Sequence, residues 1–189
     1  MLRRLGATLG VGLVSLSVAA APSSSTQTAA ALPANDVAEF IVNIARYSSW
    51  PKTASFSKSL TVCYAHGNAA PVVAPISAND WTVKGMAVNW LAISSPQQIT
   101  GCNIVWLNSE VRPAPHVWVA AVIDQPILTL SNYADFTADG GIIGAYRVGL
   151  DWRFEVNLEA LQRSQINIAA VALRLGQKPR PSAAVGAPR

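Results

Sequence analysis

Apolar side chains recur every three or four residues from position 37 onward, and this spacing predicts an amphipathic helix. Asn35 or Asp36 is placed to cap its first turn, and Pro51, which follows Trp50, ends it. Its apolar positions are Val37, Phe40, Ile41, Ile44 and Tyr47 or Ser48. Four shorter apolar runs, rich in branched and aromatic residues, predict strands at 60–64, 86–93, 104–107 and 127–130.

The second half of the chain adds further helices and a turn. Helical spacing recurs at 115–123, 158–164 and 169–175. Gly149 separates two runs, 142–146 and 153–156, that predict an antiparallel hairpin. The run 104–107 is apolar throughout, which indicates a strand buried on both faces. Because short strands alternate with helices, we predict a single α/β domain in which helices sandwich a mixed, mostly parallel sheet with a C-terminal β-hairpin.

The two ends of the chain differ from this middle. Residues 1–4 include two arginines, and 17 residues without a charge follow before Pro22. This is the layout of a secretory signal peptide, and a membrane anchor would need about 20 apolar residues. Cleavage fits after Ala20 and as late as Ala31, and the mature protein is then expected to be exported. We predict a signal peptide at 1–21, a flexible spacer at 22–34, the folded domain at 35–176 and a disordered, basic, Pro-rich tail at 177–189.

Composition narrows the function classes. Hydrophobic residues make up 51% of the 189-residue chain and charged residues 13%, which excludes a disordered protein. The net charge of +4 comes from the ends, where five of the 14 basic residues lie. Residues 32–176 hold the other nine basic side chains and all ten acidic ones, so no clustered basic face is expected. Nucleic acid is therefore not a predicted partner.

Residues that could carry catalytic or metal chemistry are scarce. His66, in a Gly/Asn turn, and His116, at a helix start, have no Cys, His or carboxylate at metal-ligand spacing. The sequence contains no Gly-x-Ser-x-Gly elbow and no Gly-x-Gly-x-x-Gly phosphate loop. We therefore predict a protein that is not an enzyme, with no catalytic residue, no metal and no cofactor.

The two cysteines favour a disulfide. An even number of cysteines in an exported protein indicates a structural bridge, here between Cys63 and Cys102. Closing a loop of about 40 residues would contribute roughly 4 kcal/mol in the chain-entropy model. Parallel strands in register would hold the two residues apart, because Cys63 is late in its strand and Cys102 precedes its own. Two buried thiols are the alternative.

Two of the six tryptophans are candidate contact residues. Trp50 and Trp152 lie at the ends of predicted elements, beside charged residues. Aromatic residues in such positions either pack at the edge of a core or contact a partner. In the second case they could line a cleft for an amino acid or an aromatic solute.

Four motifs, taken in order, resemble the YfiR-like family. They are Phe-x6-Tyr-x2-Trp-Pro at 40–51, the cysteine-bearing Leu-Thr-Val-Cys at 60–63 with Gly-Cys-Asn-Ile-Val at 101–105, Asp-Gly-Gly-Ile-Ile at 139–143 with Arg-Phe-Glu-Val-Asn at 153–157, and the final helix at 169–175. The resemblance covers about residues 37–176, nearly the whole predicted domain.

This resemblance implies a small periplasmic α/β protein without enzymatic activity. The best-known members bind the periplasmic domain of an inner-membrane diguanylate cyclase and hold it inactive, and their release raises cyclic di-GMP and promotes biofilm. Some members have a second cysteine pair around the Gly-Gly turn. Here that stretch holds Thr137 and Gly144 and no cysteine, so redox sensing through such a pair is absent. The final helix also has smaller residues than is usual in the family.

The residues expected to contact such a partner lie at the end of the predicted hairpin. Phe154 and Val156 should face the core, which leaves a polar row on the other face of the strand and two leucines at the start of the next helix. The predicted contact set is Arg153, Glu155, Asn157, Leu158 and Leu161. The polar row is either a solvated sheet edge or a recognition strip with the leucines at its apolar centre.

Two alternatives stay open. The protein could instead be a periplasmic small-ligand-binding accessory module of a membrane sensor or transporter, and a ligand that binds only one state of a complex would shift it. The oligomeric state is also open, with a homodimer among the alternatives.

Overall fold

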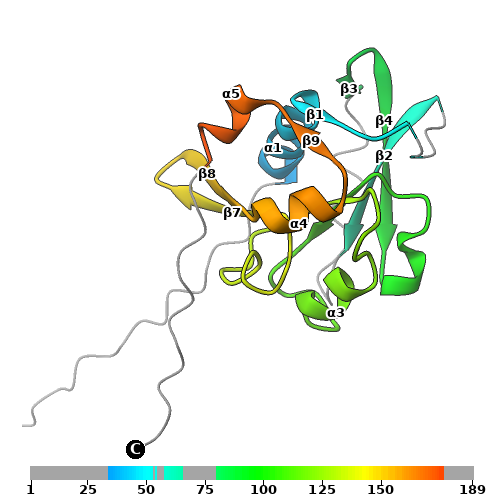
Figure 1. The fold of residues 1–189 in the computed structure, drawn as a ribbon, viewed down its shortest axis with the longest axis vertical. Coiled ribbons are helices and arrows are strands. Elements are labelled where there is room, and N and C mark those ends of the chain that lie inside the picture. Colours follow the sequence, from blue (N-terminus) through cyan, green and yellow to red (C-terminus); the bar gives the residue numbers. More distant parts are fainter. Residues whose placement is uncertain (1–33, 53, 55–57, 66–79, 177–189) are drawn as a thin grey trace, which may run out of the picture. The chain divides into compact units, whose positions relative to one another are not determined.

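A computed structural model describes residues 34–52, 54, 58–65 and 80–176, which belong to one compact unit (Figure 1). The predicted signal peptide, the spacer up to residue 33, the tail at 177–189 and His66 lie outside the described residues. Within the described ranges, no helix combines the length and the apolar character that a membrane crossing requires.

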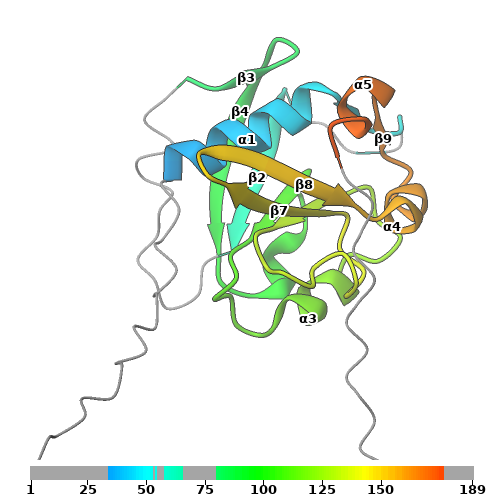
Figure 2. The ribbon, with the colours of Figure 1, turned by 90° about the vertical axis from the view of Figure 1, so that its left-hand side faces the viewer.

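Seven strands form one sheet in the order β3-β4-β2-β5-β6-β7-β8 (Figures 1 and 2). Their bounds are β2 Ser59–Ala65, β3 Thr82–Val83, β4 Met86–Ile93, β5 Ile104–Leu107, β6 Leu128–Ser131, β7 Ile143–Val148 and β8 Asp151–Val156. The central strands from β4 to β7 pair in parallel, whereas β3 and β8 lie antiparallel at the two edges. The predicted mixed, mostly parallel sheet in a single α/β domain is confirmed.

Helices cover both faces of this sheet. Their bounds are α1 Ala34–Arg46, η1 Pro96–Ile99 (a 3₁₀ helix), α3 Pro115–Ala120, α4 Leu158–Arg163 and α5 Ala170–Leu173. Residues of α1, α4 and α5 belong to one buried apolar cluster, and residues of η1 and α3 belong to the other. The antiparallel pair of β1 (Ser48–Ser49) and β9 (Asn167–Ile168) was not predicted, because two-residue strands have no periodic pattern.

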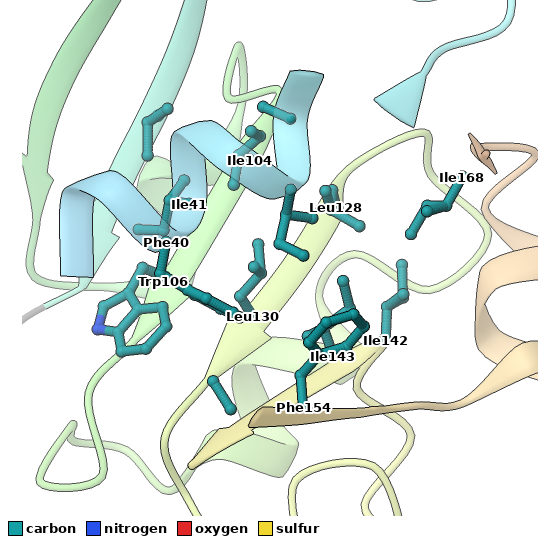
Figure 3. Close-up of a cluster of buried hydrophobic side chains, with 14 of the residues drawn as sticks. Phe40, Ile41, Ile104, Trp106, Leu128, Leu130, Ile142, Ile143, Phe154 and Ile168 are labelled. Atoms are coloured by element: carbon teal, nitrogen blue, oxygen red, sulfur yellow. The ribbon is translucent and has the colours of Figure 1, made fainter. Parts of the chain in front are cut away.

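The face under α1 is the larger apolar core. Figure 3 shows Phe40 and Ile41 of α1 beside Ile104 and Trp106 of β5. All four residues of β5 are buried, and alternate ones face opposite clusters, as the unbroken apolar run predicted. Burial raises the pKa of the Tyr64 phenol on the neighbouring strand, and hydrogen bonds with Asn108 and Trp106 lower it to a smaller extent.

The opposite face contains the predicted disulfide. Cys63 and Cys102 are bonded, with their Cα atoms 5.7 Å apart. Cys63 lies opposite Val105 in the pairing of β2 with β5, so a straight extension of β5 would put Cys102 three residues, about 10 Å, further along. Instead, Cys102 closes the turn after η1, and its N–H donates to the carbonyl of Ile99 at 2.9 Å. The turn brings the chain over the sheet face. The two cysteines can therefore bond although the strand register alone would hold them apart.

The predicted C-terminal hairpin is confirmed as β7 and β8. Val148 lies opposite Asp151 across the two-residue turn of Gly149 and Leu150. Gly149 has a φ of 62°, the left-handed conformation that the first central position of a type II′ hairpin turn requires. The hairpin places β8 at the edge of the sheet, where Figure 2 shows it running in front of β7.

Candidate functional site

The strand β8 has one paired edge and one open edge. The N–H of Asn157 donates to the carbonyl of Ile142 at 2.9 Å, so Asn157, Glu155, Arg153 and Asp151 direct their backbone groups toward β7. The alternate residues therefore direct their N–H and C=O groups away from the sheet. These residues are Trp152, Phe154 and Val156, and we call their outward backbone groups the β8 edge. No strand among the described residues pairs with it.

Glu155 is buried, with 8% of its surface exposed. The Thr137 hydroxyl donates to Oε1 of Glu155 at 2.6 Å. Gly144 lies opposite Glu155 in β7, and a Cβ at position 144 would lie 3.1 Å from Oε1, so the absence of a side chain there makes room for the carboxylate. The expectation that Glu155 belongs to an exposed polar row is wrong, because the loop that carries Thr137 covers this face of β8.

Asn157 connects the same loop to helix α4. Its side-chain oxygen accepts from the N–H of Ala160 at 3.0 Å, which caps α4. Its amide nitrogen donates to the carbonyl of Thr137 at 2.8 Å. Asn157 is half-buried, and both ends of its side chain are used within the chain. It positions the neighbouring residues, and its own side-chain amide is already engaged on both sides.

The other three predicted contact residues divide between surface and core. Leu161 is 7% exposed and packs in the core beneath α4. Leu158, the first residue of α4, is 58% exposed. Arg153 is exposed and lies 3.8 Å from the carboxylate of Asp151 on the same strand. Of the predicted set, therefore, only Arg153 and Leu158 are exposed.

Trp152 belongs to an aromatic cluster at the start of β8. Its ring stacks on Phe40 with centroids 4.8 Å apart and meets Trp106 edge-on at 6.3 Å. The Arg147 guanidinium lies 5.2 Å from the Trp152 ring centroid, within cation–π range. Arg147 also pairs with Asp36 at 3.2 Å, which connects the hairpin to the first turn of α1. Trp152 is thus held on several sides.

Trp50 is anchored elsewhere. Its Nε1 donates to the carbonyl of Asn103 at 3.3 Å, just before β5 begins. Trp152 contacts Trp106, three residues further along this extended segment, about 10 Å away. The two tryptophans proposed for a ligand cleft are therefore attached to opposite ends of β5.

Exposed apolar residues occur near both ends of β8. At the hairpin turn, Val148 is 56% exposed and Leu150 is 89% exposed. At the other end, Leu158 is 58% exposed, and Leu175, which precedes Gly176, is 69% exposed. Gly176 lies close enough to β8 that a Cβ there would lie 2.7 Å from the Phe154 ring.

The described part of the chain holds no cluster of three or more His, Cys, Asp or Glu side chains that could bind a metal ion. His116 is exposed at the start of α3.

The sequence matches the YfiR/HmsC-like family model over residues 35–177. The chain belongs to this family. The match begins at the second residue of α1 and ends just after Gly176, so it spans nearly the whole described fold. No match to the chain was found among the curated proteins. The YfiR/HmsC-like family is periplasmic, and it is regulatory rather than catalytic. The disulfide fits an oxidising compartment.

Proposed function

We propose that the protein binds the periplasmic domain of an inner-membrane diguanylate cyclase and holds the cyclase inactive, which limits cyclic di-GMP and biofilm formation. Membership of the YfiR/HmsC-like family is the observation that carries this proposal. The disulfide supports a periplasmic location, because such bonds persist where thiols are not kept reduced.

Leu158 is the proposed centre of the contact with the cyclase. A leucine that is more than half exposed at the start of a helix adds nothing to the core, whereas interfaces have an apolar centre with a polar rim. Arg153 supplies a charged group for that rim. Glu155 and Leu161 support this contact indirectly, because they hold β8 and α4 in place. Asn157 supports it by capping α4.

Replacing Leu158 by aspartate tests this contact. Position 158 follows the N-cap, where an acidic side chain is favourable to the helix, so Leu158→Asp should fold normally. In a strain that lacks the wild-type protein, this variant should leave cyclic di-GMP at the level of the deletion strain. Ile123→Asp is the matched control, because Ile123 is 57% exposed after α3, and it should restore repression.

Full repression by Leu158→Asp would show that the contact lies elsewhere. Unchanged cyclic di-GMP in the deletion strain, under every envelope stress applied, would contradict the cyclase assignment itself. Capture of a membrane cyclase from solubilised inner membranes by the wild-type protein, and not by Leu158→Asp, would connect the two results.

A further inference from the structure

Charged side chains are separated along helix α1. At its start, Asp36 and Glu39 line an open pocket with Asp80, which lies just before β3. In its last turn, Arg46 is exposed. Of the ten acidic residues in the chain, none lies between Glu39 and Asp80 or after Glu159. The segments that directly follow α1 and α4 therefore carry no acidic side chain.

Backbone contacts bring these segments together at one end of the domain. The N–H of Ala169 donates to the carbonyl of Tyr47 at 2.9 Å, beside the pairing of β1 with β9, and α5 begins at the next residue. The Lys84 ammonium, at the tip of the β3–β4 hairpin, donates to the carbonyl of Ser48 at 2.6 Å. Figures 1 and 2 show α5 and β3 near this end and α3 at the opposite end.

Basic side chains gather at this end, which we call the basic end. They are Arg46, Lys52, Lys58, Lys84 and Arg174. All of them are exposed, and none forms a salt bridge with another residue that the structure describes. Sequence analysis predicted no clustered basic face, because a net charge also counts acidic side chains that the fold places elsewhere.

Apolar side chains are exposed at the same end. Tyr47 is 48% exposed and Val171 is 57% exposed. Arg174 and Leu175 follow Val171 by three and four residues around the turn that closes α5, so these three side chains lie on one side of it. None of these exposed apolar groups adds to the core of the domain.

Basic groups with exposed apolar and aromatic groups among them suit one kind of surface. On an anionic bilayer, cationic side chains contact lipid phosphates while apolar ones enter the headgroup region. Tyrosine is enriched at this depth because its ring is apolar and its hydroxyl is polar. A nucleic acid would use the cations and leave the apolar side chains in water.

We propose that the basic end binds the surface of a membrane that contains anionic phospholipids, with Arg46 and Arg174 beside lipid phosphates and Tyr47, Val171 and Leu175 in the headgroup region. The binding is peripheral and reversible, since few apolar side chains enter the bilayer. This proposal does not depend on the cyclase. Confinement to a membrane surface would raise the effective concentration of the protein near any partner in that membrane.

Vesicle flotation of the mature exported protein, with its disulfide intact, tests the charged part of the surface. The wild type should float with vesicles of phosphatidylethanolamine and phosphatidylglycerol, and not with phosphatidylcholine alone. Arg46→Gln and Arg174→Gln should each lower the partition coefficient about fivefold, as expected for one cation lost beside an anionic membrane. Arg112→Gln is the matched control, because Arg112 is exposed shortly before α3, and it should leave partitioning unchanged.

Replacing Tyr47 tests the apolar part. Tyr47→Ser should lower the partition coefficient about fivefold, because half of a large side chain would no longer leave water. Tyr47→Trp should restore binding, since tryptophan occupies the same membrane depth. Leu150→Ser, at the exposed tip of the β7–β8 hairpin, should have no effect. Circular dichroism melting of each variant confirms that it folds.

A wild-type protein that fails to float with anionic vesicles would overturn the proposal. Equal losses for Arg112→Gln and Arg174→Gln would also overturn it, because the attraction would then not belong to the basic end. If duplex DNA binds with the same dependence on Arg46 and Arg174, and Tyr47→Ser floats as the wild type does, the surface recognises polyanions and the membrane assignment is wrong.

Discussion

The two faces of the sheet are stabilised in different ways. The first face is covered by α1, a 13-residue helix whose apolar side packs on the central strands. The second face is covered by two short helices, η1 and α3, and by loops, and it holds the disulfide. A long amphipathic helix satisfies its own backbone hydrogen bonds, whereas a loop cannot. The comparison shows what a loop-covered face needs instead.

Buried polar side chains supply the missing hydrogen bonds on the second face. The N–H of Ile142 donates to the Thr129 hydroxyl at 3.0 Å, and the Ser131 hydroxyl donates to the carbonyl of Leu107 at 2.7 Å. Thr137 donates to Glu155. These side chains and the Cys63–Cys102 bond attach the loops to the sheet, so the second face depends on specific pairs where the first depends on apolar area.

Reversing the charge at Glu155 should produce the largest loss of unfolding free energy. Lysine at position 155 would face the Thr137 hydroxyl in a space closed by the chain, and an uncompensated buried charge costs about 3–5 kcal/mol. Glu155→Gln, which keeps an acceptor oxygen, should cost far less. Urea denaturation of both variants measures the difference in unfolding free energy. Equal stability of Glu155→Lys and wild type would mean that the loop does not cover this residue.

Loss of the disulfide should produce the second-largest loss of unfolding free energy. Replacing both Cys63 and Cys102 by alanine should lower the unfolding free energy by about 2–4 kcal/mol, because the unfolded chain regains the freedom of a long loop. Reductant should destabilise the wild type and have no effect on the double variant, which serves as the control. Intact-mass measurement that finds two alkylated cysteines without reductant would contradict the bond.

The smallest expected effect on stability comes from replacing one tryptophan on each face of the sheet by phenylalanine. The Nε1 of Trp90, on the α1 side, is buried and has no hydrogen-bond partner among the described residues, so Trp90→Phe should change stability by less than about 1 kcal/mol, in either direction. The Nε1 of Trp118, on the second face, donates to the carbonyl of Pro113 at 3.0 Å. Trp118→Phe should therefore cost more. Thermal melts of the two variants make the comparison, and a larger loss for Trp90→Phe would contradict it.

Helices and strands with a clear apolar period could be predicted from the sequence. Which segments shield their faces from solvent could not be predicted. The boundaries of β4 and β5 match the predicted runs, because branched apolar residues in a short segment favour a strand wherever it lies. On β6, apolar and polar residues alternate in Leu-Thr-Leu-Ser, yet all four residues are buried. Alternation shows which side chains share a face, and a loop distant in sequence decides whether solvent reaches that face.

The candidate site illustrates the same limit. The hairpin and the helix after it were predicted, and of the five proposed contact residues Arg153 and Leu158 lie at the surface. Glu155 was placed on the correct face of β8, and its burial could not be foreseen because Thr137 reaches it from 18 residues away. Similarly, no sequence pattern indicated that Trp50 and Trp152 attach to opposite ends of β5.

By itself, the sequence indicated the fold class, the order of the longer helices and strands, a bridge between its two cysteines and the family to which it belongs. These follow from local periodicity, from turn residues such as Gly149 and from an even cysteine count. Only the tertiary structure decided that the turn after η1 carries Cys102 back over β2, that Glu155 is enclosed and that no described strand pairs with the outer edge of β8. Burial and exposure depend on which distant segments pack together, and that information is spread over the whole chain rather than carried by neighbouring residues.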